Sequence, residues 1–236
     1  MGVVNPSTGT ALGDLASGGA ADVDAVVNAA RRAFEGEWRG WSPYQRQALL
    51  IRAYDLLERR FDELAEIETV DMGAPISKTR ATKQGALRMI QFFAALALSI
   101  RGETSENGLP GDVTMMTLKA PVGMIGGIIP WNGSLTSVWW IVGAATATGC
   151  TTVLKPATEA SLTVLYLAEI LLEIGLPLGV HRTISISSGP KPCDARAARK
   201  VSWSWSFHSG RCGRGMWAPT HVSTRMFWVG VSTRNP

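Results

Sequence analysis

Two short apolar runs, each followed by a helical pattern, set the strongest limit on what this chain can fold into. Residues 122–129 and 151–154 have the length and composition of buried strands, and residues 134–147 and 161–174 have helical patterns. Apolar strands that alternate with helices are typical of a parallel sheet covered on both faces, with right-handed crossovers. The sequence therefore predicts an α/β fold for this part of the chain.

The first 100 residues are predicted to be mainly helical. One amphipathic helix follows Asp22, and a second begins at a Ser-Pro-Tyr-Gln capping box at 42–45. We expect two further, separate helices over residues 62–72 and 77–100. The residues expected to face the core are Val23, Val26, Val27, Ala30, Phe34, Leu49, Leu50, Ala53, Leu56, Leu57, Leu87, Ile90, Phe93, Ala94 and Ala97.

The composition changes abruptly after residue 180. Residues 1–180 contain 21 Leu, and residues 181–236 contain none. The first part carries 14 Lys and Arg against 18 Asp and Glu, whereas the second carries 9 against 1, so the total of +4 combines a net −4 with a net +8. The second part shows no sustained strand or helix period. We expect residues 181–236 to be an irregular basic tail, either disordered or read in a shifted frame.

Several classes of protein can be set aside. No apolar run reaches the roughly 18 residues of a membrane span, and no apolar leader follows Met1. The three cysteines do not make a disulfide framework, which favours a cytoplasmic location. Because the acidic first part contradicts the basic whole-chain charge, we expect no nucleic-acid partner. We also expect no membrane contact and no metal centre.

Short motifs distributed over residues 3–180 point to one family. They are Asn-Pro-x-Thr-Gly at 5–9, Glu-x-x-Asp-x-Gly-x-Pro at 68–75, Gly-Glu-Thr at 102–104, Pro-Val-Gly at 121–123, Ile-Ile-Pro-Trp-Asn at 128–132, Leu-Lys-Pro-Ala at 154–157 and Gly-Leu-Pro-x-Gly-Val at 175–180. Together, in their order and spacing, these motifs resemble the aldehyde dehydrogenase family. The resemblance implies an incomplete, Rossmann-like NAD(P)-binding domain over residues 1–180, with an oligomerisation hairpin inserted at 103–119.

The resemblance also implies a reaction and the residues that serve it. In the family, a Cys thiolate attacks an aldehyde, hydride passes to the nicotinamide of NAD or NADP, and a water activated by Glu releases the carboxylic acid. Asn132 would donate its amide to the developing oxyanion, and Lys155 would reach the adenosine ribose. The other cofactor-binding candidates are Ile128, Ile129, Pro130, Trp131, Pro156, Thr158 and Glu159. Thr158 stands where the family often has an acidic residue, so the choice between NAD and NADP stays open.

Three further motifs of the family do not occur in the sequence. They are Phe-Thr-Gly-Ser at the pyrophosphate, Glu-Leu-Gly-Gly-Lys around the general base, and Gly-Gln-x-Cys around the nucleophile. Cys193 and Cys212 lack the neighbours of that nucleophile. We therefore expect a truncated dehydrogenase that is inactive alone. A frameshift after Val180 predicts that another reading frame of the gene contains the three motifs in order.

Each assignment has a simpler alternative. Asn132 could be a turn residue or a helix cap, and Lys155 a solvated strand end. Trp139 and Trp140 are expected to pack in the core. Cys150 is expected to be a small buried apolar residue and not a nucleophile.

Two other readings of the whole chain stay open. The chain could be a non-catalytic interaction protein that pairs with a full-length relative through the 103–119 hairpin and an exposed sheet edge. Its basic, Trp-containing tail could bind single-stranded nucleic acid. The family reading predicts a small aldehyde as substrate and a homo-oligomer in the intact protein.

Overall fold

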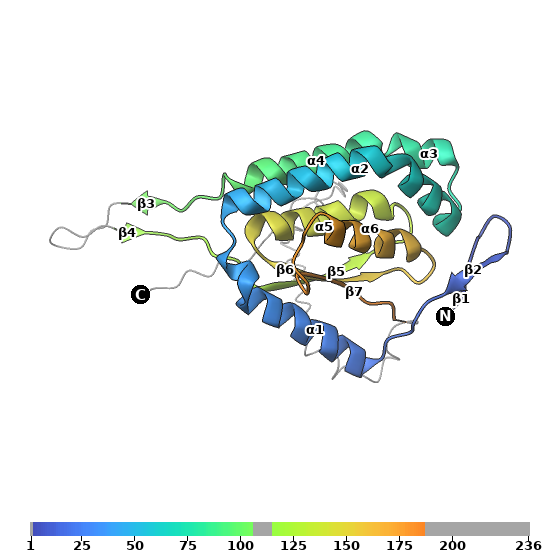
Figure 1. Ribbon diagram of the computed structural model, residues 1–236, viewed down its shortest axis with the longest axis horizontal. Coiled ribbons are helices and arrows are strands. Elements are labelled where there is room, and N and C mark those ends of the chain that lie inside the picture. The colour runs from blue at the N-terminus through green and yellow to red at the C-terminus, as the bar shows by residue number, and fades with distance from the viewer. Residues whose placement is uncertain (1, 106–114, 187–236) are drawn as a thin grey trace, which may run out of the picture.

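The computed structural model describes residues 2–105 and 115–186 (Figure 1). The longer helices are α1 (Ala20–Glu35), α2 (Pro43–Met72), α4 (Lys83–Ala97), α5 (Ser134–Thr148) and α6 (Leu162–Glu173). The shorter ones are α3 (Ile76–Ala81) and the 3-10 helix η1 (Glu37–Gly40). The strands are β1 (Gly2–Val4), β2 (Ala11–Asp14), β3 (Thr104–Ser105), β4 (Met115–Met116), β5 (Met124–Ile129), β6 (Thr151–Pro156) and β7 (His181–Thr183).

A parallel sheet of order β5-β6-β7 forms the centre of the fold. Helix α5 connects β5 to β6, and α6 connects β6 to β7. The predicted alternation of strands and helices is therefore confirmed. The strand β7 corrects the predicted boundary, because the regular fold continues past residue 180. His181 pairs there with Thr152 of β6, so the segment that looked irregular in sequence gains order from a neighbouring strand.

The helices lie in layers on both faces of the sheet (Figure 1). Helix α1 covers one face, where the hydroxyl of Thr151 on β6 donates to the Ala30 carbonyl of α1 at 3.1 Å. Helices α5 and α6 cover the other face, with α2 and α4 packed outside them. The core between these layers contains the stripes predicted for α2 and α4, including Leu49, Leu57, Leu87, Ile90 and Phe93. Burial of these apolar faces is the main stabilising contribution to the fold.

The boundaries of the helices differ from prediction at two places. Residues 62–72 do not form a separate helix, because α2 has no glycine or proline between Pro43 and Gly73 and its apolar stripe continues through Phe61. The predicted helix over 77–100 is instead two helices, α3 and α4, that meet at Thr82. The capping box is confirmed: the Ser42 hydroxyl accepts from the Gln45 amide, and the Gln45 side chain accepts from the Ser42 amide.

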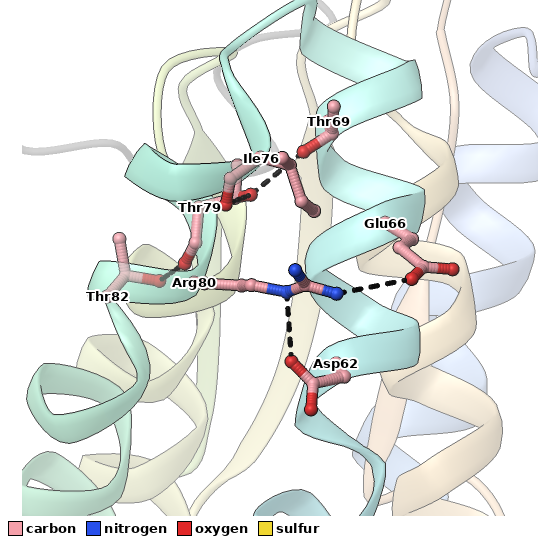
Figure 2. Close-up of polar contacts among 7 residues, drawn as sticks. All are labelled: Asp62, Glu66, Thr69, Ile76, Thr79, Arg80 and Thr82. Carbon is pink, nitrogen blue, oxygen red and sulfur yellow. Dashed lines mark hydrogen bonds and ion pairs between the residues drawn. The ribbon is translucent and has the colours of Figure 1, made fainter.

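Polar contacts hold α3 against α2 at this break (Figure 2). The hydroxyls of Thr69 and Thr79 lie 2.8 Å apart, and the Thr82 hydroxyl donates to the Thr79 carbonyl at 2.7 Å. The Arg80 guanidinium contacts Asp62 at 3.1 Å and Glu66 at 3.5 Å. The turn at Thr82 therefore has a local hydrogen bond to Thr79, while Thr79 and Arg80 join α3 to α2.

Three side chains in and after α5 test the core assignments. Trp139 is 0% exposed, as predicted, but Trp140 is 41% exposed, so the prediction for Trp140 is wrong. Successive residues of a helix point about 100° apart, and a single helix face cannot bury both rings. Cys150 is 1% exposed with a free thiol, which confirms a small buried residue.

Strands β3 and β4, at the base of the predicted 103–119 hairpin, extend away from the body of the molecule (Figure 1). Strands β3 and β4 pair antiparallel, with Thr104 opposite Met116. The predicted hairpin is thus present at its base, and residues 106–114 lie outside the described residues. Met115, Met116 and Leu118 are 52%, 60% and 74% exposed. Among the helices that the structure describes, none is both long and apolar enough to cross a membrane.

Candidate functional site

The carboxyl ends of β5 and β6 bring the two predicted site segments together. Ile128 pairs with Lys155, and Ile129 pairs with Pro156. Just past the strands, the Ala157 amide donates to the Ile129 carbonyl at 2.9 Å. In an open α/β sheet this end of the strands is where ligands bind.

The alternation of the strands divides the candidate residues between two faces. Ile129 is 1% exposed and Pro156 is buried, so both side chains belong to the core beneath α5 and α6. Ile128, on the opposite face, is 56% exposed, and its neighbour Lys155 is half-buried. Because successive residues of a strand point to opposite faces, Ile129 and Pro156 can offer a ligand only their backbone. Ile128 and Lys155 can offer side chains.

The loops beyond the strands hold the remaining candidates. Trp131 is 56% exposed, and Pro130 and Asn132 are also exposed. The half-buried Thr158 donates its hydroxyl to the Ile186 carbonyl at 3.4 Å, whereas Glu159 is exposed. These loops place an indole ring and polar groups around the same edge of the sheet.

Lys155 is neither buried nor fully solvated. Its ammonium donates to the carbonyl of Pro156 at 3.2 Å, a contact between neighbouring residues. Such a local bond can be exchanged for a bond to a bound anion or hydroxyl. The arrangement fits a ligand that combines an apolar ring with hydroxyl or phosphate groups.

Asn132 does not cap α5. The capping residue is Gly133, with φ of +125°, a conformation that glycine adopts readily. Within residues 2–105 and 115–186, the Asn132 side chain makes no hydrogen bond, so the helix-cap alternative is not supported.

Two buried carboxylates behind this edge were not assigned a role in the sequence analysis. Glu68 of α2 is 1% exposed and accepts from the Leu135 amide of α5 at 2.9 Å. Asp71, one turn later, is 0% exposed and accepts from the amide and the hydroxyl of Thr163 in α6, at 3.0 and 3.1 Å. The signal in the sequence was the Glu-x-x-Asp motif at 68–71, which places both acids on one helix face.

The environment of these acids opposes their ionisation only in part. Burial raises the pKa of Glu68 and of Asp71, while hydrogen bonds from backbone amides act in the opposite direction. Each acid lies at the positive end of a helix dipole, which favours the ionised form. Because Glu68 uses the Leu135 amide, the N-terminus of α5 already holds a carboxyl group of the protein itself.

Two arginines of α2 contact the opposite ends of the same helices. The Arg46 guanidinium donates to the Ala147 carbonyl of α5 at 3.2 Å, and the Arg52 guanidinium donates to the Ile174 carbonyl after α6 at 2.9 Å. Helix α2 therefore runs antiparallel to both helices and places a complementary charge at each of their four ends.

His181 is a further polar residue that the sequence analysis left in the tail. It is 8% exposed, its Nδ1 lies 2.8 Å from the Thr152 hydroxyl, and its Nε2 lies 3.2 Å from the Thr183 hydroxyl. Burial, with a smaller contribution from Arg182, lowers its pKa to about 4. The ring is therefore neutral at pH 7, and its contact with Thr152 joins β6 to β7.

Other kinds of site are not evident in the described ranges. No group of three or more His, Cys, Asp or Glu side chains there could hold a metal ion. An apolar groove lies between α2 and α4, away from the strand ends, and is lined by Leu50, Ile51, Tyr54, Ile90, Gln91 and Ala94. The carboxyl ends of β5 and β6 thus remain the best candidate for a functional site.

Known proteins are similar to this chain in sequence and in architecture. The family model described as "Aldehyde dehydrogenase family" matches residues 1–202, which extends past residue 180, where we placed the end of the resemblance. The DhaS protein of Bacillus subtilis is 40% identical over 212 residues, 88% of this chain and 42% of that protein. Aminoacetaldehyde dehydrogenase of Pseudomonas aeruginosa is 38% identical over 182 residues, 76% of this chain and 36% of that protein.

Solved structures of other proteins are also similar to the fold of this chain. An NADP-dependent enzyme from E. coli has a TM-score of 0.76 at 32% identity, over 80% of this chain and 39% of that chain. An NAD-dependent aldehyde dehydrogenase from Sinorhizobium meliloti has a TM-score of 0.76 at 34% identity, over 80% of this chain and 38% of that chain. This chain spans about two fifths of the length of these proteins. On its sequence and its fold, the chain belongs to the aldehyde dehydrogenase family.

Proposed function

We propose that this chain supplies the NAD(P)-binding strand edge and the oxyanion-stabilising amide of an aldehyde dehydrogenase, which oxidises an aldehyde to a carboxylic acid. The observation that carries the proposal is the pairing of Ile128 with Lys155 at the carboxyl ends of β5 and β6, with Asn132 in the adjoining loop. When bound, the nicotinamide accepts the hydride of the aldehyde. The chain's own residues bind and orient the reactants.

The exposed side chains divide these tasks by their chemistry. Ile128 and Trp131 offer apolar surface to the rings of the cofactor, while the Lys155 ammonium can donate to ribose hydroxyls or pair with a 2′-phosphate. Pro130, Thr158 and Glu159 border the same edge of the sheet, and Ile129 and Pro156 contribute backbone. One similar structure is described as NADP-dependent and another as NAD-dependent, so both cofactors are candidates.

Asn132 is proposed as the donor to the developing oxyanion. A neutral amide aimed at an oxygen that becomes negative in the transition state lowers the barrier without a proton transfer. The exposed position of Asn132, free of any bond to described residues, suits that role.

The described residues include no candidate for the nucleophile. Cys150 is buried just before β6, at the end of the strand opposite to Lys155, and Cys193 and Cys212 lie outside the described residues. We therefore expect the purified chain to bind cofactor but not to oxidise aldehydes. Saturable, NAD(P)-dependent oxidation by the chain alone would contradict this expectation.

Calorimetric titration with NAD+ and NADP+ tests the cofactor site. We expect saturable binding, and we expect Lys155→Met to weaken NADP+ binding at least tenfold, because a charged hydrogen bond contributes about 1.5–3 kcal/mol. Lys78→Met, an exposed substitution on α3, serves as the control and leaves binding unchanged. Absence of saturable binding to the folded chain would refute the proposed site.

A second candidate function is subunit interaction. Two observations favour it: the exposed Met115, Met116 and Leu118 at the base of the hairpin, and the edge of β5 that pairs with no other strand among the described residues. Unpaired edges recruit further strands. Co-purification with a full-length family member at fixed stoichiometry would support this function, and an exclusively monomeric chain in its presence would refute it.

The tail remains a separate hypothesis, because residues 187–236 lie outside the described residues. We propose that the chain after Val180, residues 181–236, is read in a shifted frame. Resequencing the gene and translating all frames tests the idea, which requires the three missing motifs to occur in order. The cytoplasmic location also stays a proposal, supported by the lack of a disulfide framework.

A further inference from the structure

We propose that Glu68 and Asp71 are positioning residues for the strand-end site, which hold the first turns of α5 and α6 and with them the loop that carries Asn132 and the loop that follows Lys155. What those loops do rests on the proposed function; how they are held is read from the structure alone. Glu68 and Asp71 contact neither Asn132 nor Lys155 and act through the starts of the two helices.

The loop that carries Asn132 needs an external support. Asn132 is joined to α5 through Gly133, which has a φ of +125°. Glycine can adopt many other backbone conformations, so Gly133 by itself restrains the direction of the chain only weakly. The Glu68 carboxylate bonds the Leu135 amide, two residues further on. The direction of the chain at Asn132 therefore depends on a contact from α2. This contact is made by Glu68, which lies 67 residues before Leu135 in the sequence.

The second loop has an equivalent support. The segment after Lys155 leads through Thr158 to the start of α6, where Asp71 accepts both hydrogen bonds of Thr163. Two hydrogen bonds donated by Thr163 to one carboxylate oxygen of Asp71 fix the position and the rotation of this helix start. The loop is thus held between β6 on one side and Asp71 on the other.

The burial of Glu68 and Asp71 indicates that these acids orient the starts of α5 and α6 and do not merely fill space. A buried carboxylate is unfavourable compared with an apolar side chain of similar volume. Moreover, Glu68 Oε2 and Asp71 Oδ1 are buried with no hydrogen-bond partner in the structure as described. A side chain that only filled space would avoid both penalties, whereas a directional bond to a helix N-terminus requires an acceptor.

The arginines of α2 provide matched controls. Arg46 and Glu68 contact opposite ends of α5, and Arg52 and Asp71 contact opposite ends of α6 or its following residue. Loss of either member of a pair weakens the same helix packing. Only loss of the acid disturbs the end that adjoins the site.

The test uses the whole chain labelled with nitrogen-15. Glu68→Met removes the acceptor, Glu68→Gln keeps an acceptor oxygen without charge, and Arg46→Met is the control at the far end of α5. The readouts are hydrogen exchange of the Leu135 amide, the side-chain amide signals of Asn132, and NAD(P)+ affinity. If Glu68→Met does not fold, Glu68→Asp replaces it, because the shorter side chain withdraws the oxygen from Leu135.

We expect Glu68→Met or Glu68→Asp to speed exchange at Leu135 at least tenfold and to shift or broaden the Asn132 signals. Glu68→Gln restores both, and Arg46→Met leaves both unchanged while lowering the melting temperature. Native Asn132 signals in Glu68→Met, or equal shifts in Arg46→Met, would overturn the proposal. The NMR readouts need no cofactor, so failure of NAD(P)+ to bind would count against the proposed function and not against this positioning role.

The role of Asp71 is tested in the same way, by amide hydrogen exchange. Asp71→Ala speeds exchange at the Thr163 amide, Asp71→Asn preserves it, and Arg52→Met does not change it. Unchanged exchange in a folded Asp71→Ala chain would remove Asp71 from the proposal.

Discussion

Gly143 on α5 offers a quantitative test of the packing between helices. An alanine Cβ at this position would lie 2.5 Å from Phe93 Cδ2, 3.1 Å from Cγ and 3.2 Å from Cε2. Carbon atoms pack at about 3.5–4.0 Å, so the ring or the helix must move by about 1 Å. Phe93 is 1% exposed and belongs to the core, so its ring can move only by displacing packed neighbours.

The magnitude follows from two opposed contributions. Replacing glycine by alanine inside a helix stabilises by about 0.5–1 kcal/mol, and overpacking a core destabilises by about 1–3 kcal/mol. We therefore expect Gly143→Ala to lower the free energy of unfolding by about 1 kcal/mol, within a range of about 0–2.5 kcal/mol. For a protein of this size, a loss of about 1 kcal/mol corresponds to a fall in melting temperature of roughly 2–4 °C.

Gly85 on α4 is the matched control. A Cβ added there meets nothing within 4 Å, so Gly85→Ala retains the helical gain without the clash. Urea denaturation of both variants measures the difference. If Gly143→Ala is as stable as Gly85→Ala, the close contact between α5 and Phe93 is not as the structure describes it.

Three further predictions concern buried and exposed polar groups. The folded-state pKa of His181 is about 4, and its ordinary value is 6.5. The stability that neutral His181 confers is therefore present above pH 6.5 and is lost as the pH falls toward 4, by ~3 kcal/mol. Urea denaturation at several pH values should show a smaller loss of stability in His181→Gln than in the native chain. Cys150, at 1% exposed, should resist alkylation in the native chain and react after denaturation, and rapid native labelling would contradict its burial. Arg80→Ala should change stability by less than about 1 kcal/mol, and less still at high salt, since Asp62 and Glu66 are 75% and 66% exposed; a larger, salt-independent loss would show that these ion pairs matter more than exposed pairs usually do.

The candidate site was predictable in part, because its main residues belong to local motifs. Ile128 and Lys155 each end an apolar strand, and parallel strands separated by helices bring their carboxyl ends together. The division between Ile128 and Ile129 also follows from strand alternation, but which of the two faces solvent depended on where the helices pack. The roles of Glu68 and Arg46 could not be read from the chain, because their partners lie 67 and 101 residues away.

By itself, the sequence determined the features that arise from near neighbours. The Ser42 capping box, the apolar stripes of α2 and α4, and the strands β5 and β6 all appear where periodicity and capping residues predict them. These features depend on interactions within a few residues, so their signal is local and survives without knowledge of the fold.

The tertiary structure alone decided where elements join, end and face. It recruited His181 into a third strand beside Thr152 of β6, and it joined α2 to the first turns of α5 and α6 through Glu68 and Asp71. Each of these outcomes depends on a surface supplied by a distant part of the chain. A sequence pattern records what a residue favours, and only the packed neighbours determine which of those options has the lowest free energy.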